Sequence, residues 1–210
     1  MTYSKNKDTL TKEEENVLNA NFESNISAKE NDFTGAFKGK NLIIVQLESI
    51  DNFLLDKDIM PTFYKISQNS LNFVNHYSFT SGGGSTFNSE FMINTGYSTA
   101  YNYNMNAYSF SKNAYPYSLP NLLKNDGYES NVFHMNSGEY YSRKVNYKSF
   151  GYNDYYGLKD LNIYHDNEFW LDTELMKNET FNNKIFKKDK LSLSYIITYS
   201  AHMPFKTNKG

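Results

Sequence analysis

The sequence has no cysteine, a single arginine, no long apolar run and no excess of one charge. The absence of cysteine excludes disulfides and thiolate metal sites. Its 21 Lys and Arg residues are balanced by 23 Asp and Glu residues, whereas a nucleic-acid-binding domain usually carries a basic face. We therefore expect no nucleic-acid partner. The apolar runs are only a few residues long, too short to cross a membrane as a helix.

The single arginine, Arg143, stands out because lysine cannot reproduce the planar, bidentate grip of a guanidinium on phosphate. Arg143 is therefore a candidate phosphate ligand, with an ordinary surface arginine as the alternative. Aromatic residues make up 17% of the chain, which favours a folded domain over a disordered one. The abundance of Lys, Asn and Tyr suggests an AT-rich genome.

Residues 1–40 form a polar lead-in. Thr11 and Glu14 have the spacing of a capping box, which predicts a short helix around residues 12–20. Residues 1–10 lack the apolar segment of a signal peptide. If the protein is exported, we expect the exporting segment to lie outside this sequence.

Strands and helices alternate along residues 41–210. The run Asn41–Leu47 is rich in β-branched residues, which is typical of a strand buried on both faces of a parallel sheet. Further strands are predicted over residues 70–78, 128–135 and 191–200, and helices over 61–66, 89–94, 118–127, 142–149 and 169–186. This alternation predicts an α/β fold with a mostly parallel central sheet flanked by helices.

The segment Ser81–Phe91 contains three consecutive glycines, then hydroxyl residues and a predicted helix start. Glycine lets a backbone approach a ligand closely, and a helix N-terminus favours negative charge. Thr86 is therefore placed to act as a nucleophile or to bind phosphate, although most such segments are only turns.

The other candidate groups follow the ends of predicted strands, where ligands bind in α/β sheets. Glu48 closes the first strand and could hold a metal ion, cap the next segment or face water. His134 and His202 lie at or just beyond later strand ends. A carboxylate with a hydroxyl suits Mn²⁺, Mg²⁺ or Zn²⁺, while an arginine and a histidine can clamp phosphoryl oxygens. The set predicts metal-assisted transfer of a phosphate or sulfate group.

Four segments in this order and spacing resemble the extracellular domain of lipoteichoic acid synthases, which are phosphoglycerol transferases of the alkaline phosphatase/sulfatase superfamily. These segments are Leu42–Ser49, Gly84–Phe91, Phe133–Arg143 and Tyr199–Phe205. The resemblance covers residues 35–210 and implies the fold of that superfamily. It implies that residues 41–210 are the N-terminal portion of the catalytic domain.

The resemblance also implies roles for individual residues. Glu48 would be a manganese ligand, and Thr86 would be both a ligand and the nucleophile. Thr86 would take glycerol phosphate from phosphatidylglycerol as a covalent intermediate and pass it to a lipoteichoic acid-type polymer. The substrate-binding positions would be Arg143, His202, Tyr141 and His134. Tyr141 stands where the family commonly has tryptophan, which keeps an aromatic wall but changes the pocket.

Family members complete the metal site with an Asp-His pair on a later strand, and this sequence contains no Asp-His dipeptide. We therefore expect weak or no manganese binding and no turnover by this chain alone, together with uncovered strand edges that invite association. The resemblance places the protein at the extracellular face of the cell membrane of a low-GC Gram-positive-type bacterium, attached by a segment absent from this chain.

Three alternatives stay open from the sequence. The first is another enzyme of the superfamily, a sulfatase or a phosphoethanolamine transferase. Sulfatases generally use a modified cysteine or serine, and the chain has no cysteine. The second is a domain that binds glycerol phosphate polymers without chemistry. The third is an inactive paralogue.

Overall fold

The computed structural model describes residues 10–25, 29–77, 86–98, 106–163, 170–186 and 189–203. Contacts divide the chain into two units, Met1–Gly39 and Lys40–Gly210, which are described separately. Among the described residues, no helix has the length and apolarity needed to span a bilayer.

In the described residues of the first unit there is one helix, α1, at Lys12–Asn25. The predicted capping box forms at its start: the Thr11 N–H donates to Glu14 Oε2 at 2.8 Å, and the Glu14 N–H donates to Thr11 Oγ1 at 3.3 Å. This reciprocal pairing satisfies two N–H groups that a helix start otherwise leaves without partners. The helix extends five residues beyond the predicted end at residue 20.

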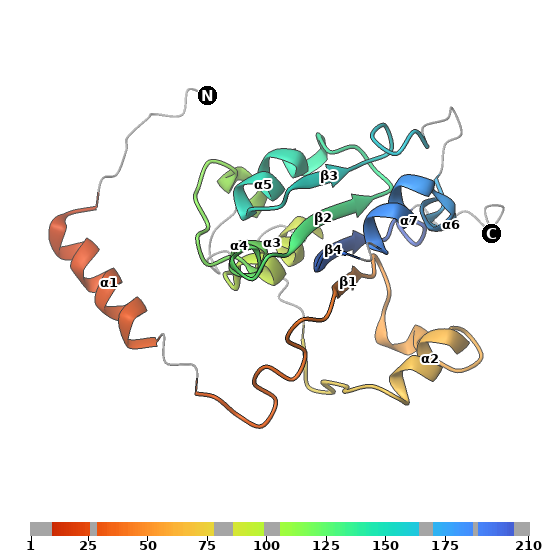
Figure 1. The fold of residues 1–210 in the computed structure, drawn as a ribbon, viewed down its shortest axis with the longest axis horizontal. Helices are drawn as coiled ribbons and strands as arrows, with labels where there is room; N and C mark the ends of the chain where they lie inside the picture. Colours follow the sequence, from red (N-terminus) through yellow and green to blue (C-terminus); the bar gives the residue numbers. More distant parts are fainter. Residues whose placement is uncertain are drawn as a thin grey trace. The chain divides into compact units, whose positions relative to one another are not determined.

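The second unit is an α/β domain around four parallel strands (Figure 1). The strands are β1 (Leu42–Gln46), β2 (Glu129–His134), β3 (Asp154–Tyr156) and β4 (Ser192–Ile197), in the order β1-β4-β2-β3. The helices are α2 (Pro61–Ser67), α3 (Thr86–Thr95), α4 (Leu119–Asn125), α5 (Arg143–Phe150), α6 (Asp172–Lys177) and α7 (Glu179–Ile185). Short 3₁₀ turns occupy η1 (Asn52–Leu54), η2 (Ala107–Phe110) and η3 (Tyr140–Ser142). The prediction of an α/β fold with a mostly parallel sheet is confirmed.

Two apolar clusters cover the two faces of the sheet. On one face, α3, α4 and α5 pack against alternate residues of β4, such as Tyr195 and Ile197. On the other face, α6 and α7 pack against the intervening residue Ile196 and against Phe133 of β2. Successive side chains of a strand point to opposite faces, so a strand covered on both sides reads as a continuous apolar run. Strand β4 fits this description, since all six of its residues are buried.

Strand β1 is an exception to the expected burial. We predicted a strand buried on both faces, but β1 lies at the edge of the described sheet, and Ile43 and Val45 are each 46% exposed. Its other face is covered, because Leu42 and Ile44 pack against the cluster that contains α3. The prediction was wrong for one face because an apolar run does not reveal what packs against it.

The predicted strand over residues 70–78 was also wrong. Residues 70–77 form turns and irregular structure, and Leu71, Phe73, Val74 and Tyr77 are all at least 75% exposed. Residue 78 lies outside the described residues. The alternation of apolar residues resembled a strand, but no sheet edge among the described residues pairs with it.

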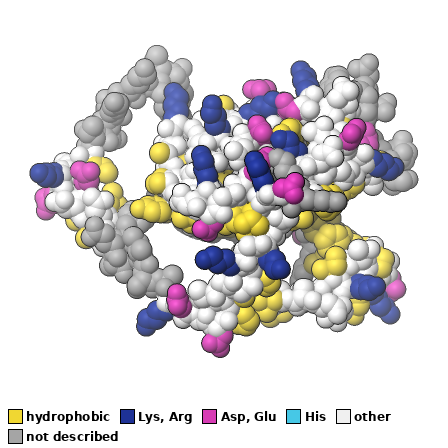
Figure 2. All heavy atoms as spheres, in the orientation of Figure 1, with side chains coloured by type: hydrophobic (Ala, Val, Ile, Leu, Met, Phe, Trp, Pro, Cys, Tyr) yellow, Lys and Arg dark blue, Asp and Glu magenta, His cyan; other side chains and the backbone are white. Residues whose placement is uncertain are grey.

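On the face shown in Figure 2, exposed hydrophobic side chains lie among interspersed charges of both signs.

Two smaller differences have local causes. The helix predicted over 169–186 is divided at Asn178, whose backbone is extended and whose side chain accepts the Phe181 N–H as the N-cap of α7. Strand β3 lies in a segment for which neither a strand nor a helix was predicted. It has only three residues and pairs with β2 from Asn131 to Phe133.

Candidate active site

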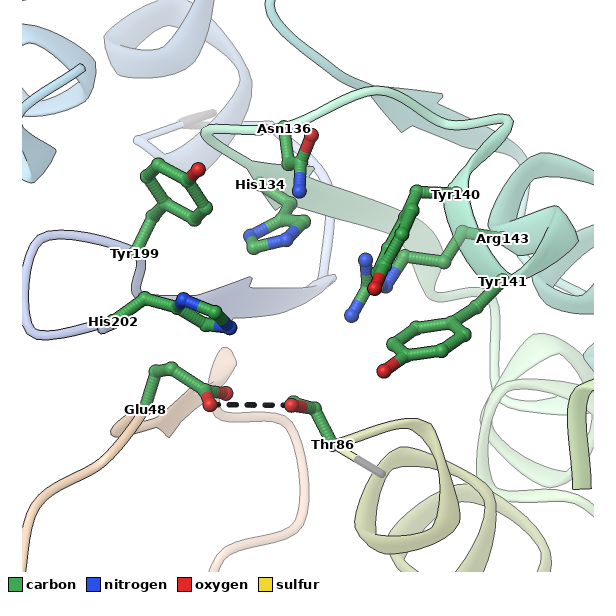
Figure 3. Close-up of a pocket in the computed structure, with 9 residues that line it drawn as sticks. All are labelled: Glu48, Thr86, His134, Asn136, Tyr140, Tyr141, Arg143, Tyr199 and His202. Carbon is green, nitrogen blue, oxygen red and sulfur yellow. Dashed lines mark hydrogen bonds between the residues drawn. The ribbon is translucent and has the colours of Figure 1, made fainter. Parts of the chain in front are cut away.

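Nine side chains line a pocket at the carboxyl ends of the strands (Figure 3). They are Glu48, Thr86, His134, Asn136, Tyr140, Tyr141, Arg143, Tyr199 and His202. The set includes all six candidate residues chosen from the sequence. The strand-end location agrees with the usual position of ligand sites in open α/β sheets.

Glu48 and Thr86 come from separate segments and meet in this pocket. Glu48 follows β1, and Thr86 is the first residue of α3. The Thr86 hydroxyl donates to Glu48 Oε1 at 3.2 Å, which is the dashed line in Figure 3. The hydrogen bond brings a hydroxyl and a carboxylate together at the N-terminus of a ten-residue helix. Residues 81–85, which include the predicted glycine segment, lie outside the described residues.

The backbone around Glu48 is held by the neighbouring strand. The Glu48 N–H donates to Thr198 Oγ1 at 2.8 Å, and the Thr198 N–H donates to the carbonyl of Gln46 at 3.0 Å. Directly after Glu48, Ser49 has a left-handed φ of 54°. Non-glycine residues adopt this conformation at a cost of about 1 kcal/mol or more, and such residues are common at functional sites.

His134 is the last residue of β2 and is 3% exposed. Its Nδ1 lies 2.9 Å from the carbonyl oxygen of Ile197. Because a carbonyl only accepts hydrogen bonds, Nδ1 carries the proton and Nε2 is left as an acceptor. Burial, together with the positive charge of Arg143, lowers the pKa of His134 to about 3. His134 is therefore neutral near pH 7, and its ring points into the pocket (Figure 3).

Arg143 begins α5 and is 2% exposed, so it is not the surface arginine that the sequence left open. Its Nε lies 3.1 Å from each carboxylate oxygen of Glu90, and its Nη2 lies 2.6 Å from Glu90 Oε1. Burial acts to lower the pKa of Arg143, but the charge of Glu90 outweighs burial and holds this pKa above its ordinary value. The remaining nitrogen, Nη1, is buried and has no hydrogen-bond partner within the described part of the chain.

Two tyrosines form an aromatic wall beside Arg143. The Arg143 guanidinium carbon lies 5.0 Å from the ring centre of Tyr141 and 6.0 Å from that of Tyr140, within the range of cation–π attraction. Tyr141 also stacks on Tyr108 of η2 with ring centres 5.4 Å apart. Tyr141 and Ser142 both have left-handed backbone conformations, with φ of 56° and 48°. Burial and a hydrogen bond with Tyr140 raise the pKa of Tyr141 to about 12, so its phenol stays protonated.

His202 lies in the turn after β4 and is partly exposed. Its N–H donates to the Tyr199 carbonyl at 2.9 Å, and its ring stacks on Tyr199 with centres 5.8 Å apart. The turn is held from outside by Asp172 of α6. The Asp172 carboxylate accepts the N–H of Tyr199 at 2.8 Å and the N–H of Ser200 at 2.9 Å.

Sequence reasoning missed Glu90, Tyr140, Tyr199 and Asp172. The spacing of Glu90 from Thr86 was a usable signal, because residues four apart in a helix share a face. Tyr140 and Tyr199 belong to the segments Phe133–Arg143 and Tyr199–Phe205. Tyrosine is so common in this chain that neither residue could be distinguished from the others by its type. Asp172 follows a predicted helix start, and nothing in the sequence pairs it with a turn 27 residues later.

The donor set fits a hard divalent cation in part. Glu48 and Thr86 offer two oxygen donors 3.2 Å apart, the donor type that Mg²⁺ and Mn²⁺ prefer. In the ranges that the structure describes, no three His, Asp or Glu side chains gather into a metal-binding cluster. Glu48 and Thr86 could therefore contribute to a metal site, with further ligands required.

Residues 40–209 match the family model described as sulfatase. The chain belongs to the sulfatase family. It is 28% identical over 214 residues to lipoteichoic acid synthase 2 of Bacillus subtilis, with 94% of this chain and 31% of that protein covered. It is also 28% identical over 192 residues to lipoteichoic acid synthase of Staphylococcus aureus, with 83% of this chain and 28% of that protein covered.

Solved structures agree with this family membership. The lipoteichoic acid synthase LtaP from Listeria monocytogenes superimposes with a TM-score of 0.71 at 27% identity, covering 90% of this chain and 48% of that chain. The Streptococcus pyogenes phosphoglycerol transferase GacH shares the fold, with a TM-score of 0.59 at 20% identity over 81% of this chain and 47% of that chain. The resemblance to lipoteichoic acid synthases of the alkaline phosphatase/sulfatase superfamily is therefore confirmed. This sulfatase-family chain spans about a third of the length of the curated relatives.

Proposed function

We propose that this sulfatase-family chain contributes the nucleophile and the phosphate-binding groups of a phosphoglycerol transferase. The relatives are named lipoteichoic acid synthases. The observation that carries the proposal is the Thr86–Glu48 hydrogen bond of 3.2 Å in a pocket that also contains Arg143 and two histidines. The pocket at the strand ends brings together a hydroxyl, a carboxylate and a buried cation. Phosphoryl transfer uses these groups as nucleophile, proton acceptor and phosphate ligand.

The proposed donor is phosphatidylglycerol and the proposed acceptor is the end of a glycerol phosphate polymer. In the first step, a bond forms between Thr86 Oγ1 and phosphorus while the bond from phosphorus to the diacylglycerol oxygen breaks. The Thr86 proton passes by way of Glu48, the group that already accepts its hydrogen bond, to the departing diacylglycerol oxygen. In the second step, an acceptor hydroxyl oxygen displaces Thr86 from phosphorus, and the proton of that hydroxyl passes to Thr86 Oγ1.

The other pocket residues would bind the transferred group. Arg143 directs its unpartnered Nη1 toward a phosphoryl oxygen, where a fixed positive charge stabilises the charge that develops during transfer. His134 is neutral with a free acceptor at Nε2, which suits a glycerol hydroxyl better than a phosphate. The Tyr141 ring and His202 would close the sides of the pocket.

Enzymes of this superfamily generally use metal ions, and we propose that Glu48 and Thr86 are two of the ligands for Mn²⁺, with Mg²⁺ or Zn²⁺ as alternatives. When bound, such an ion would favour the deprotonated form of the Thr86 hydroxyl. The ligands that complete the site would come from residues other than those described here. We further propose that the protein works at the extracellular face of the cell membrane, where phosphatidylglycerol is available.

The test compares Thr86→Ala with Thr86→Ser in the full-length protein. With phosphatidylglycerol as donor, we expect Thr86→Ala to lose transfer of glycerol phosphate by roughly a thousandfold or more, and Thr86→Ser to keep a measurable rate because it retains the hydroxyl. Binding of glycerol 3-phosphate is measured for both variants by calorimetry. Transfer by Thr86→Ala at the unmodified rate would contradict the proposal. Binding without transfer in the unmodified protein would instead favour a domain that only recognises glycerol phosphate polymers.

A further inference from the structure

The buried pair of Glu90 and Arg143 lies behind the pocket and is made of two fully desolvated charges. Glu90 is 0% exposed and Arg143 is 2% exposed. The carboxylate binds Arg143 through Nε and Nη2, with contacts of 2.6 to 3.1 Å. This two-point contact uses one edge of the planar guanidinium and fixes the direction of the other nitrogen, Nη1.

The nitrogen that Glu90 does not hold is the one without a partner. Arg143 lines the pocket (Figure 3), and its Nη1 makes no hydrogen bond to any described residue. A buried donor without a partner costs roughly 1–3 kcal/mol, and among the buried side-chain atoms without a partner in the described residues only Arg143 Nη1 belongs to a residue that lines the pocket. The arrangement leaves the two N–H groups of Arg143 Nη1 without a partner among the described residues, as donors for an anion in the pocket.

Glu90 is itself fixed by a second contact. The Tyr147 hydroxyl donates to Glu90 Oε2 at 2.8 Å. Burial, together with the charge of Glu90, raises the pKa of Tyr147 well above its ordinary value, so this phenol remains a donor. The carboxylate is therefore held by Arg143 and Tyr147 of the same helix, α5, and cannot turn without breaking hydrogen bonds.

Helix α3 links this carboxylate to the proposed nucleophile. Thr86 and Glu90 both belong to α3 and are four residues apart, so they lie on the same face about one turn from each other. One helix therefore sets the position of the Thr86 hydroxyl and the orientation of Arg143. A change in the helix would move the two groups together.

We propose that Glu90 is a positioning residue that orients Arg143 Nη1 toward the phosphoryl group of the substrate. The proposal rests on the proposed function, because it assigns Arg143 the role of phosphate ligand. Charge balance alone does not explain the pair, since a buried ion pair often adds little stability over apolar residues of similar size. The unpartnered Nη1 of Arg143, a residue that lines the pocket, gives the pair a use beyond packing.

The main test is a double-mutant cycle in the full-length protein, with glycerol phosphate transfer as the readout. Glu90→Gln keeps the shape of the side chain but removes its charge and one acceptor. We expect kcat/KM to fall roughly tenfold to a hundredfold, because a small displacement of a catalytic group has effects of this size. In an Arg143→Lys background, Glu90→Gln should change kcat/KM by less than about threefold, because the group that it orients is gone. Equal effects in both backgrounds would overturn the proposal.

Two further variants keep the test decisive. Tyr147→Phe removes one hydrogen bond from Glu90 and leaves the charges in place. We therefore expect a smaller, several-fold loss of kcat/KM, which can be measured even if Glu90→Gln does not fold. An unchanged kcat/KM for Tyr147→Phe would then overturn the proposal. Glu129→Gln is the matched control, since Glu129 is a partly buried carboxylate near Lys184 and away from the pocket. It should leave kcat/KM unchanged.

Failure of the two proposals can be distinguished. If the unmodified protein does not transfer glycerol phosphate, the proposed function fails, and the cycle is then run on the affinity for glycerol 3-phosphate. If the unmodified protein transfers glycerol phosphate but Glu90→Gln has full kcat/KM, only the positioning role fails.

Discussion

The two sides of the pocket are built differently. Arg143 and His134 are almost fully buried and are held by the interior of the domain, through Glu90 and the Ile197 carbonyl. Glu48 and His202 are partly exposed and are held through the backbone of their turns, by Thr198 and Asp172. The side chains of the buried side contribute to the stability of the fold, whereas the positions of the exposed side chains depend on local contacts in their turns. Substitutions should therefore affect stability and activity together on the first side and separately on the second.

The largest effect on stability is expected from Arg143→Met. This substitution leaves the buried carboxylate of Glu90 without its counter-charge, and breaking a buried pair in this way costs about 3–5 kcal/mol. Chemical denaturation should show a loss of this size, and transfer should be lost as well. The matched change on the other side is Glu48→Gln, which should abolish transfer at a cost of about 1 kcal/mol or less. Equal losses of stability in Arg143→Met and Glu48→Gln would contradict the proposed difference between the buried and exposed sides.

His134 should make the stability of the buried side depend on pH. Its pKa is about 3 in the folded protein and about 6.5 ordinarily, so the unfolded chain binds the proton first as the pH falls. The free energy of unfolding should be at its full value above pH 6.5. It should decrease between pH 6.5 and 3 by up to about 1.4 kcal/mol per pH unit.

The measurement is the free energy of unfolding against pH, taken as the difference between the unmodified chain and His134→Gln. The variant lacks the titrating group, so the difference isolates His134 from the acidic residues. Arg143 and His202, the charged groups that contribute to the low pKa, are the same in both proteins. An imidazole that titrates near pH 6.5 by NMR would contradict the buried, neutral assignment.

A smaller effect is expected from Asp172→Asn on the exposed side. The charged carboxylate accepts the N–H groups of Tyr199 and Ser200, and its replacement by an amide should cost about 1–2 kcal/mol. Because this turn carries His202, kcat/KM for transfer should also fall several-fold. Asp154→Asn, at an exposed position in β3, is the matched control and should change neither quantity. A loss of stability with full kcat/KM would show that transfer does not depend on this anchor.

The sequence predicted the parts of the fold that depend on local pattern. The apolar runs of β1 and β4 and the Thr11–Glu14 capping box each specify a local structure, and these elements form. Residues 70–77 mislead because alternation of apolar residues indicates a strand only when a partner strand is available. Likewise, the half-exposed face of β1 depends on what packs against it, which its own residues do not encode.

The candidate site was predictable as a list of groups but not as an arrangement. Strand ends converge in a parallel sheet, so Glu48, His134 and His202 could be expected on one rim. The pairing of Glu90 with Arg143 joins residues 53 positions apart, and no local pattern signals it. The sequence identified Arg143 as unusual, while the structure shows which of its nitrogens has no hydrogen-bond partner among the described residues.

The central claim is that the Thr86 hydroxyl takes up glycerol phosphate, and its most direct test is to look for that adduct. The full-length protein is exposed briefly to phosphatidylglycerol without acceptor, quenched in acid, digested and analysed by mass spectrometry. The account predicts a glycerophosphoryl group on the peptide that contains Thr86, absent from Thr86→Ala. Transfer of glycerol phosphate with this peptide unmodified, or with the adduct on another residue, would contradict the account.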